Sequence, residues 1–307
     1  MTDQRQYLRQ CKLILTNPSG QGLDLSKMRI VFNVKKSSSQ TTNAALIRIY
    51  NLSDNTKNLI RKEFQNVVLE AGYQTNSGVI FSGNIKQYLF GRENATDTYV
   101  DIAAADGDNA YNFATISTTL SGGSSQQDQL NAIIKTFEPY GVTPGYIEPL
   151  DYVSLPRAKP MYGMSRDYLR KLTESTDSTW SIQDGKLQIL KKTSLLPGET
   201  VVLNSKTGLI GTPEQTNEGI AISALLNPLI KVNGTAQVNQ KDIQEARLED
   251  TNAAYVANNA PSISPDGFYR VLVAEYIGDT FGNDWEVNTI CLSADISAPG
   301  NEKVANT

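Results

Sequence analysis

The chain of 307 residues is long enough for two or three compact domains, and its 39% hydrophobic and 20% charged residues are ordinary for a globular protein. Its formal net charge of -4 argues against a protein that grips DNA, because non-specific affinity for a duplex comes from Lys and Arg that neutralise phosphates. The chain contains no histidine, which excludes Ser-His-Asp and Cys-His catalysis and any zinc site with a histidine ligand.

The N-terminal segment MTDQRQYLRQCKLIL lacks the apolar core of a signal peptide, and the sequence has no run of about 18 apolar residues that could span a membrane. We therefore expect a soluble chain, made in a cytoplasm, without membrane insertion. Two cysteines, Cys11 and Cys291, lie near opposite ends of the sequence. In a reducing compartment we expect free, half-buried thiols, and neither has a second cysteine nearby with which to bind a metal.

The first third of the chain has the composition of β-structure. Short segments rich in Val, Ile, Tyr and Phe alternate with Gly, Asn and Ser, which is the pattern of strands separated by turns. Their close spacing predicts a small β-barrel or sandwich over residues 1–105. The five predicted strands are MRIVFNVKK, ALIRIYNL, NVVLEAGY, GVIFSGNIKQYLF and TYVDIAAAD.

One helix is predicted among these strands, in the segment SDNTKNLIRKEF. Ser53 can cap its N-terminus, and Leu59, Ile60 and Phe64 are spaced to point inward. This helix would plug or flank the barrel.

A second helix is predicted over residues 124–138. Ser124 and Gln127 have the spacing of a capping box, and Pro139 follows the helix end. Because Gln129 lies opposite the apolar stripe, Gln129→Asp should be nearly neutral, whereas Ile134→Asp should cost several kcal/mol. The stripe has the spacing i, i+3, i+4, i+7 and consists of Leu130, Ile133, Ile134 and Phe137.

A third helix is predicted in GMSRDYLRKLTES. Ser165 is its expected cap, and Tyr168, Leu169 and Leu172 are its expected packing face.

A hairpin is predicted directly after this helix, because Asp184-Gly185 is a type I′ turn signal. A two-residue loop there pairs Ile182 with Leu187 and Trp180 with Ile189 on one face. We interpret Trp180 as a core residue, and we expect residues 106–196 to form an αβ module.

Residues 197–217 are punctuated by Gly and Pro and are interpreted as connective. Strands are predicted next, in EGIAISALLNPLIKVNGTAQVN, around a hairpin signal at Asn233-Gly234. The polar stretch from Gln240 to Asp266 is expected to be a long loop with one or two helical turns. Residues 197–307 are expected to form a second β-barrel domain.

The last hairpin, GFYRVLVAEYIGDTFGNDWEVNTICLSAD, has an alternating second arm. Trp285, Val287, Thr289 and Cys291 share one face, which we expect to be buried. The first arm, Tyr269 to Ile277, is apolar on both faces, so protein is expected to cover both.

Three features of the sequence have residue types that occur in binding sites. GDTFGND, residues 278–284, offers Asp279, Asn283 and Asp284 to a cation but lacks the spacing of a calcium loop, so we interpret it as a turn. GLIGTPEQTNEG lacks the pattern of a phosphate-binding loop. The lysine pairs 35–36 and 191–192 (Lys35, Lys36, Lys191, Lys192) are interpreted as solvated strand ends. We therefore predict no catalytic, metal-binding or cofactor-binding residues, no cofactor and no enzyme activity.

Six stretches, in this order, resemble the baseplate hub family of contractile-tailed bacteriophages, from about residue 44 to residue 292. The most specific are IYNLS, EGIAISALLNP and AEYIGDTFGNDW. The six are ALIRIYNLSDNT, AGYQTNSGVIFSGNI, DIAAADGDNAYN, YGMSRDYLRKLTESTDSTWSIQDGKLQIL, IGTPEQTNEGIAISALLNP and YRVLVAEYIGDTFGNDWEVNTICL.

This resemblance implies a structural virion protein. It would form a homotrimeric ring that adapts the hexameric tail tube above to the trimeric central spike below, and DNA would pass through the channel without specific binding. The implied location is the tail baseplate, after assembly in the host cytoplasm. Family members are often longer, which puts contacts to other baseplate proteins in doubt for this chain.

The implied fold carries two related β-barrels. The fold class we predict is α+β, mainly β, with two small β-barrel domains at residues 1–105 and 197–307 flanking the smaller αβ module. A six-fold tube meets three chains evenly only if each chain presents two similar units. We therefore expect the β core of residues 1–105 to superpose on that of residues 200–295, with the stretch 67–88 matched to 269–290. The channel surface should be neutral to acidic.

Two other functions stay open. A receptor-binding or carbohydrate-binding tail protein would also be β-rich, and it should expose aromatic platforms. A cell-wall hydrolase that uses paired carboxylates needs no histidine, and the 32 Asp and Glu residues meet its demand without selecting a site.

Overall fold

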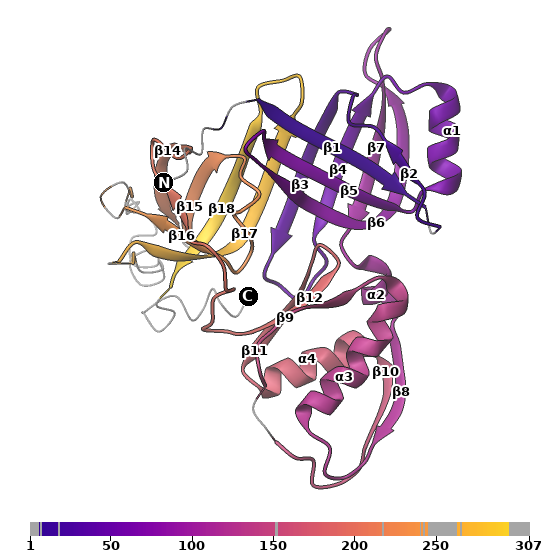
Figure 1. Ribbon diagram of the computed structural model, residues 1–307, viewed down its shortest axis with the longest axis vertical. Coiled ribbons are helices and arrows are strands. Elements are labelled where there is room, and N and C mark those ends of the chain that lie inside the picture. The colour runs from indigo at the N-terminus through magenta and orange to yellow at the C-terminus, as the bar shows by residue number, and fades with distance from the viewer. Residues whose placement is uncertain are drawn as a thin grey trace, which may run out of the picture.

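The structure of the chain is a computed structural model, and it describes residues 6, 8–17, 19–150, 153–216, 218–239, 241, 243–244, 263–264 and 266–294. Its largest feature is a 13-stranded sheet (Figure 1). Hydrogen-bonded neighbours run in the order β14-β15-β18-β17-β3-β4-β7-β6-β5-β1-β2, and β16 joins β17 and carries β13. The chain is therefore mainly β, of the α+β class, as predicted, and the two predicted β-barrel regions lie side by side in this one sheet.

The five predicted strands of the first region are all present, and two more precede them. Sequence patterning does not reveal β1, because only Leu13 and Leu15 of its eight residues are fully buried. The strands are β1 (Arg9–Thr16), β2 (Gly22–Asp24), β3 (Ile30–Ser37), β4 (Ala44–Tyr50), β5 (Asn66–Tyr73), β6 (Asn76–Arg92) and β7 (Thr98–Ala105).

Helix α1 (Asp54–Glu63) follows β4, and its predicted cap is confirmed, because the Ser53 side chain accepts the backbone N–H of Thr56 at 3.2 Å. Ile60 and Phe64 are buried, as predicted. The expectation for Leu59 is wrong: its side chain is 39% exposed, because the helix turns one narrow stripe toward the core.

The last third of the chain contains more strands than predicted. The segment interpreted as connective contains β13 and β14, which pair with β16 and β15. A hairpin at Asn233-Gly234 is not formed, since β15 pairs with β14 and β18 whereas β16 pairs with β13 and β17. Asn233 does adopt a left-handed φ of 65°, which is what the turn signal requires. The strands are β13 (Val201–Leu203), β14 (Leu209–Thr216), β15 (Gly219–Leu225), β16 (Thr235–Val238), β17 (Phe268–Asp279) and β18 (Trp285–Ser293).

Strands β17 and β18 form the predicted last hairpin, and the predicted face of β18, from Trp285 to Cys291, is buried. The two-sided pattern of β17 has a local cause. Its register against β18 shifts between Val271 and Val273, so Leu272 is the extra residue of a β-bulge. The bulge moves the buried set from odd to even positions, from Val271 to Ala274 and onward. Past the bulge only one face of β17 is fully buried within the chain, and coverage of its other face by protein remains a prediction.

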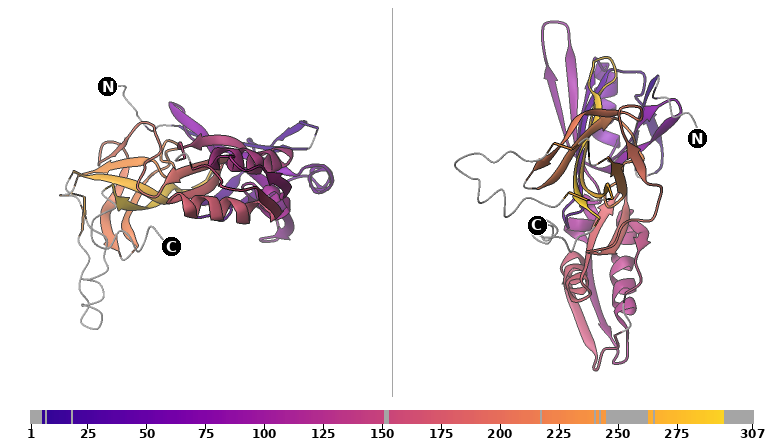
Figure 2. Two further views of the ribbon diagram at one scale, coloured as in Figure 1. Left: turned by 90° about the horizontal axis from the view of Figure 1, so that it is seen from below. Right: turned by 90° about the vertical axis from the view of Figure 1, so that its left-hand side faces the viewer.

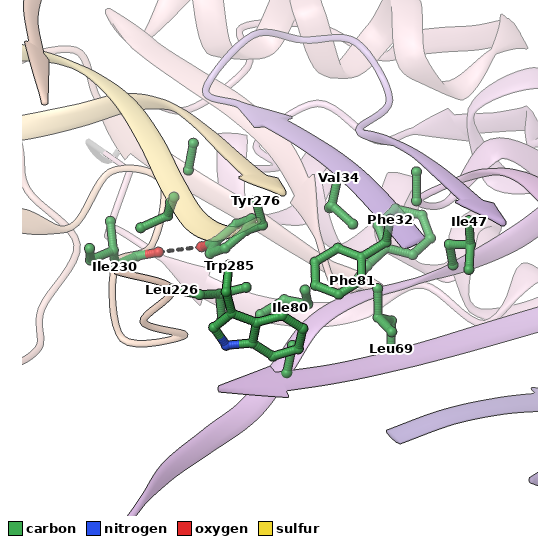
Figure 3. Close-up of a cluster of buried hydrophobic side chains, with 14 of the residues drawn as sticks. Phe32, Val34, Ile47, Leu69, Ile80, Phe81, Leu226, Ile230, Tyr276 and Trp285 are labelled. Carbon is green, nitrogen blue, oxygen red and sulfur yellow. Dashed lines mark hydrogen bonds between the residues drawn. The ribbon is translucent and has the colours of Figure 1, made fainter. Parts of the chain in front are cut away.

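A single apolar core joins the first and last thirds of the chain. Phe32 of β3 meets Trp285 of β18 edge-to-face, with ring centroids 5.5 Å apart and planes at 73° (Figure 3). Tyr276 lies beside them and donates its hydroxyl to the Ile230 carbonyl. Each large apolar side chain buried here contributes about 1.5 to 3 kcal/mol. The two β regions are therefore held together by side-chain packing as well as by strand pairing.

The middle of the chain forms a helical module that extends below the sheet (Figures 1 and 2). Its own apolar core runs from Ala110 to Ile189, separate from the core of the sheet. Its elements are α2 (Asp108–Phe113), β8 (Thr115–Leu120), α3 (Gln126–Phe137), η1 (Glu138–Tyr140), β9 (Thr143–Ile147), β10 (Lys159–Met164), α4 (Ser165–Ser175), β11 (Ser178–Gln183) and β12 (Lys186–Lys191).

The apolar stripe predicted for α3 is confirmed: all four of its residues are buried. Its capping box is one residue later than predicted and is formed by Ser125 and Asp128. The expectation for Gln129 is wrong, because this side chain is 3% exposed and accepts a 2.7 Å hydrogen bond from Lys159 of β10.

Helix α4 starts one residue earlier than predicted, so Ser165 is its first residue and not its cap. Met164 is the N-cap, without a side-chain hydrogen bond, and Ser165 is fully buried inside the first turn.

The β11–β12 hairpin follows the prediction in register and turn. Trp180 pairs with Ile189 and Ile182 with Leu187, and both residues of the Asp184-Gly185 turn have positive φ. Trp180 is 1% exposed, as a core residue should be.

Most of the loop predicted from residue 240 to 266 lies outside the described residues. The division of the chain at residues 105 and 196 remains a prediction; residues 106–196 have an apolar core of their own, whereas the first and last regions share one core. No helix of the described part is long and apolar enough to cross a membrane.

Candidate functional site: the uncovered face of the sheet

Seven neighbouring strands, β15-β18-β17-β3-β4-β7-β6, turn one face away from the core, and we call it the outer face. Side chains alternate between the two sides of a strand. On β3, Phe32 and Val34 point into the core, so Asn33 between them points outward. Residues paired across neighbouring strands point to the same side of a sheet. Leu46 of β4 and Ile277 of β17 both pair with Asn33, so they also point outward. In Figure 1, β1 and β5 cross in front of β3 and β4, so the outer face is on the far side.

An ion pair occupies the middle of the outer face. The Arg48 guanidinium donates two hydrogen bonds to the Asp101 carboxylate, at 2.7 and 2.9 Å, and lies 3.9 Å from the centroid of the Tyr99 ring. The hydrogen bond to Asp101 raises the pKa of Arg48, so the pair stays ionised and neutral overall.

The remaining charges of the outer face are few. The Arg29 guanidinium is paired with Asp279 at one end of β17, with an N–O distance of 2.7 Å. The Glu275 carboxylate lies opposite the Lys35 ammonium, and the Glu286 carboxylate lies on the neighbouring strand β18. The exposed charges of the described outer face therefore nearly cancel.

Buried polar groups dock the tip of the β11–β12 hairpin onto the sheet. The Asn43 amide donates to the Ile182 carbonyl at 2.8 Å and to the Gln183 side chain at 2.9 Å. The Asp106 carboxylate, at the end of β7, accepts both backbone N–H groups of the Asp184-Gly185 turn.

A buried ion pair completes this contact. The Lys36 ammonium lies 2.6 Å from the Asp184 carboxylate and the residue is 5% exposed, so its interpretation as a solvated strand end is wrong. The hairpin covers Lys36, and this tertiary contact has no local sequence signal. We call the set of Lys36, Asn43, Asp106, Gln183 and Asp184 the hairpin junction.

The Asp106 carboxyl of the hairpin junction has a shifted pKa. Burial raises it to about 6, and the negative charge of Asp184 adds to the rise, whereas the backbone N–H of Gly185 and the Lys36 ammonium oppose it. Because Asp106 is fully buried, no substrate reaches it, and its raised pKa is a consequence of packing and not a sign of general acid catalysis.

The segment 278–284 is a turn, as predicted. The Asp279 carboxylate is used by Arg29 and by the backbone N–H of Phe281 at 3.0 Å. Throughout the described ranges, no group of three His, Cys, Asp or Glu residues is placed to hold a metal ion.

The two cysteines are free thiols, Cys291 buried and Cys11 half-buried, and burial raises the pKa of each to about 12. Such thiols are poor nucleophiles at neutral pH.

No family model and no curated protein matches this sequence, whereas solved structures match its fold. A tail protein from Neisseria meningitidis aligns with a TM-score of 0.59 and 8% identity, over 96% of this chain and 99% of its own. The 43 kDa tail protein of prophage MuSo2 from Shewanella oneidensis aligns with a TM-score of 0.57 and 8% identity, over 92% and 97%. The chain has the fold of phage tail proteins.

The same tail-protein fold extends to a secretion system. The E. coli c3393 protein, a type VI secretion component similar in structure to the T4 bacteriophage tail proteins gp27 and gp5, aligns with a TM-score of 0.54 and 8% identity, over 87% of this chain and 73% of its own. The resemblance to baseplate hub proteins is thus confirmed at the level of the fold.

Proposed function

We propose that this chain is a structural protein of a phage tail baseplate, where it forms a homotrimeric hub that adapts the hexameric tail tube to the trimeric central spike. Beyond the tail-protein fold, one observation carries the proposal. The first and last thirds of the chain repeat one strand order within a continuous sheet.

The repeat covers five strands in each region. The first region has the order β3-β4-β7-β6-β5 and the last has β14-β15-β18-β17-β16, and every neighbouring pair is antiparallel. In each region, the hairpin of the first two strands (β3–β4 or β14–β15) lies beside the hairpin of the last two strands (β6–β7 or β17–β18). The final strand in sequence, β7 or β18, is the one that pairs with the first hairpin. Four antiparallel steps separate β14 from β3, so these two strands run in the same direction, and both regions bury the same side of the sheet. A rotation that advances four strands along the sheet therefore relates the two regions.

This correspondence corrects one detail of the expected duplication. The β17–β18 hairpin takes the position of β6–β7, not of β5–β6, so the stretches 67–88 and 269–290 are not equivalent. Superposition of the two β cores remains a prediction.

Two similar units per chain would solve the symmetry mismatch between tube and spike. Three chains would present six quasi-equivalent units to the tube and three identical surfaces to the spike. The tube protein and the spike protein are thus the expected partners, and the expected location is the virion, after assembly in the host cytoplasm.

The outer face is suited to line the channel of such a ring. Its exposed arginines Arg29 and Arg48 are paired with carboxylates, so the exposed charges nearly cancel. A polyanion such as DNA would slide past this surface, because affinity for a duplex needs unpaired Lys and Arg.

The alternative of a receptor-binding or carbohydrate-binding protein has less support. Trp180 and Trp285 are 1% and 2% exposed, and the strongly exposed aromatic residues Phe113, Tyr162 and Phe281 belong to separate elements. The hydrolase alternative has no assembled site in the described chain, and we propose that the protein is not an enzyme and has no cofactor.

The test is the subunit number of the purified full-length chain, by native mass spectrometry and by class averages of negatively stained particles over a concentration series. We expect a ring of three copies with a central opening. A ring with another subunit number, or a monomer at every concentration, would overturn the proposal. Clearance of a peptidoglycan suspension by the same sample would favour the hydrolase instead.

A further inference from the structure

We infer that the edge of β6 from Gln87 to Arg92 binds β14 of a second copy of this chain, and that this strand pairing joins the subunits of the ring. The inference rests on the proposed trimeric hub and adds the surfaces through which its subunits meet.

The edge in question is the second half of a long strand. Strand β6 has 17 residues; β7 pairs with it as far as Arg92, whereas β5 pairs with it only as far as Asn84. From Gln87 onward, the edge that faces away from β7 has no partner strand in the part of the chain that the structure describes. An unpaired edge presents backbone N–H and C=O groups to any strand that approaches.

The β-bulge between Ile85 and Gln87 lies just before this edge and the charged Arg92 ends it, but the other devices that keep an edge strand from pairing are absent from the edge itself. The edge contains no proline, and its neighbouring residues Leu89 and Phe90, which point to opposite faces, are 51% and 40% exposed. Apolar side chains exposed on both faces of an unpaired edge are expected where another strand packs.

The repeat inside the chain indicates which strand this is. Strand β17 takes the position of β6 in the last region, and its second half pairs with β3 from Val273 to Asp279. In the last region, β14 takes the position that β3 has in the first region. Within the chain, β17 of the last region pairs with β3 of the first region. If the same contact is repeated between two copies, β6 replaces β17 and β14 replaces β3, so β14 of one copy pairs with β6 of another.

Strand β14 presents an open edge near its start only, because Gly211 is left-handed, Pro213 has no backbone N–H and the register against β15 is irregular between Ile210 and Glu214. It is the terminal strand of the sheet on that side, and among the described residues Gln244 contacts its far end, where it bridges to Glu214. Nearer its start, Ile210 is 38% exposed and lies opposite Ser223 of β15, on the outer face. Leu89 of β6 lies on this same face, so the pairing would bring these two apolar side chains together.

A single chain cannot make this contact. Six strands separate β14 from β6, and seven spacings of about 4.8 Å amount to roughly 34 Å. A covalent link between the two strands therefore reports on contact between copies.

The experiment combines Leu89→Cys with Ile210→Cys in the full chain and treats it with a short bismaleimide. A reagent that spans about 8 Å reaches both directly opposite and diagonal positions of paired strands. We expect a denaturing gel with dimer and trimer bands that stop at three copies, because a closed ring uses every pair. The unaltered chain and each single variant are the controls for Cys11 and Cys291, and they should stay monomeric on the gel.

The outcomes separate the two proposals. A native trimer that gives no cross-link overturns the β6–β14 contact and leaves the hub intact. Cross-linked ladders that continue beyond three copies support the contact and overturn the closed trimeric ring.

A charge substitution provides an independent test. Leu89→Lys should abolish the native trimer, because it puts an ammonium into the contact. Leu46→Lys is the matched control: Leu46 is 53% exposed on the same outer face but lies in the interior strand β4, so the trimer should persist. Equal trimer content in both variants, each folded by circular dichroism, would overturn the contact.

Discussion

Asp106 is the buried carboxyl on which the hairpin junction depends, and it makes the stability of the protein depend on pH. Its pKa in the folded chain is raised to about 6 from an ordinary 3.8, so the folded state holds this proton more tightly than the unfolded state. The contribution is fully present below about pH 4 and is lost as the pH rises through about 6. The contribution of Asp106 to the free energy of unfolding is roughly 3 kcal/mol at most, because each unit of pKa corresponds to about 1.4 kcal/mol.

The substitution Asp106→Asn should remove this dependence. The free energy of unfolding of the unaltered chain, measured by urea denaturation relative to the variant, should fall between pH 4 and pH 6. Glu174→Gln, at an exposed position of the same module, should leave the pH profile unchanged. Parallel profiles for the unaltered chain and Asp106→Asn would show that Asp106 does not titrate in this range.

Gly278 is a position where close packing forbids a side chain. A Cβ there would lie 2.4 Å from the Phe32 ring and 2.9 Å from that of Trp285, inside the core shown in Figure 3. Overpacking of this kind costs about 1 to 3 kcal/mol, so Gly278→Ala should lower the free energy of unfolding by that amount. Gly198→Ala is the control, because nothing lies within 4 Å of its Cβ position, and it should be neutral. Equal stabilities would contradict the packing around the hairpin.

Among the elements, helix α3 gives the clearest test of a predicted face. Ile134 is 8% exposed within the apolar core of the module, so Ile134→Asp should cost several kcal/mol by burying an unpaired charge. The appropriate control is Asn131→Asp, on the exposed side of the helix, since Gln129 is buried against Lys159. Thermal melts should show a large loss for the first variant and almost none for the second; similar losses would mean that the helix packs differently.

The elements that sequence reasoning located are those whose burial alternates or repeats locally. Strands β3 to β7 and helix α3 bury whole stripes, so their residue patterns are strong. Strands β1 and β14 bury only part of their length, and a one-sided edge strand has too few apolar residues for a pattern. The residues Asn233-Gly234 predict a turn, but this local signal does not indicate the pairing of β16 with β17, because β17 lies about 30 residues later in the sequence.

The candidate site was beyond sequence reasoning for a related reason. Outward residues such as Lys35 and Glu275 become one surface only through the register of β3 against β17, which joins segments about 240 residues apart. The sequence around Lys36 indicates a solvated side chain. Its partner Asp184 lies in the β11–β12 hairpin, about 150 residues later, and the two meet only in the folded chain.

At the scale of the whole molecule, the chain combines two apolar cores with a polar contact between them. The sheet unites the first and last regions in one core, whereas the helical module has its own core. The hairpin junction is a major contact between them, since Asn43 and Asp106 of the sheet region bond directly to the β11–β12 hairpin. The strength of this contact decides whether the module moves with the sheet.

Asn43→Ala should uncouple the two cores. The substitution removes three hydrogen bonds of the buried Asn43 side chain. Their other partners are the Ile182 carbonyl, the Gln183 side chain and the Ser37 backbone N–H. Each unsatisfied buried group costs about 1 to 3 kcal/mol. A loss of about 1 kcal/mol lowers the melting temperature of a domain of about 60 to 100 residues, such as the helical module, by roughly 4 to 8 °C. Calorimetry should therefore resolve a lower transition, for the helical module, from a little-changed transition for the sheet. Thr41→Ala, two residues away and exposed, should melt like the unaltered chain. If Asn43→Ala instead shifts one undivided transition, the module and the sheet unfold as one cooperative unit, and their apolar cores are coupled by more than the hairpin junction.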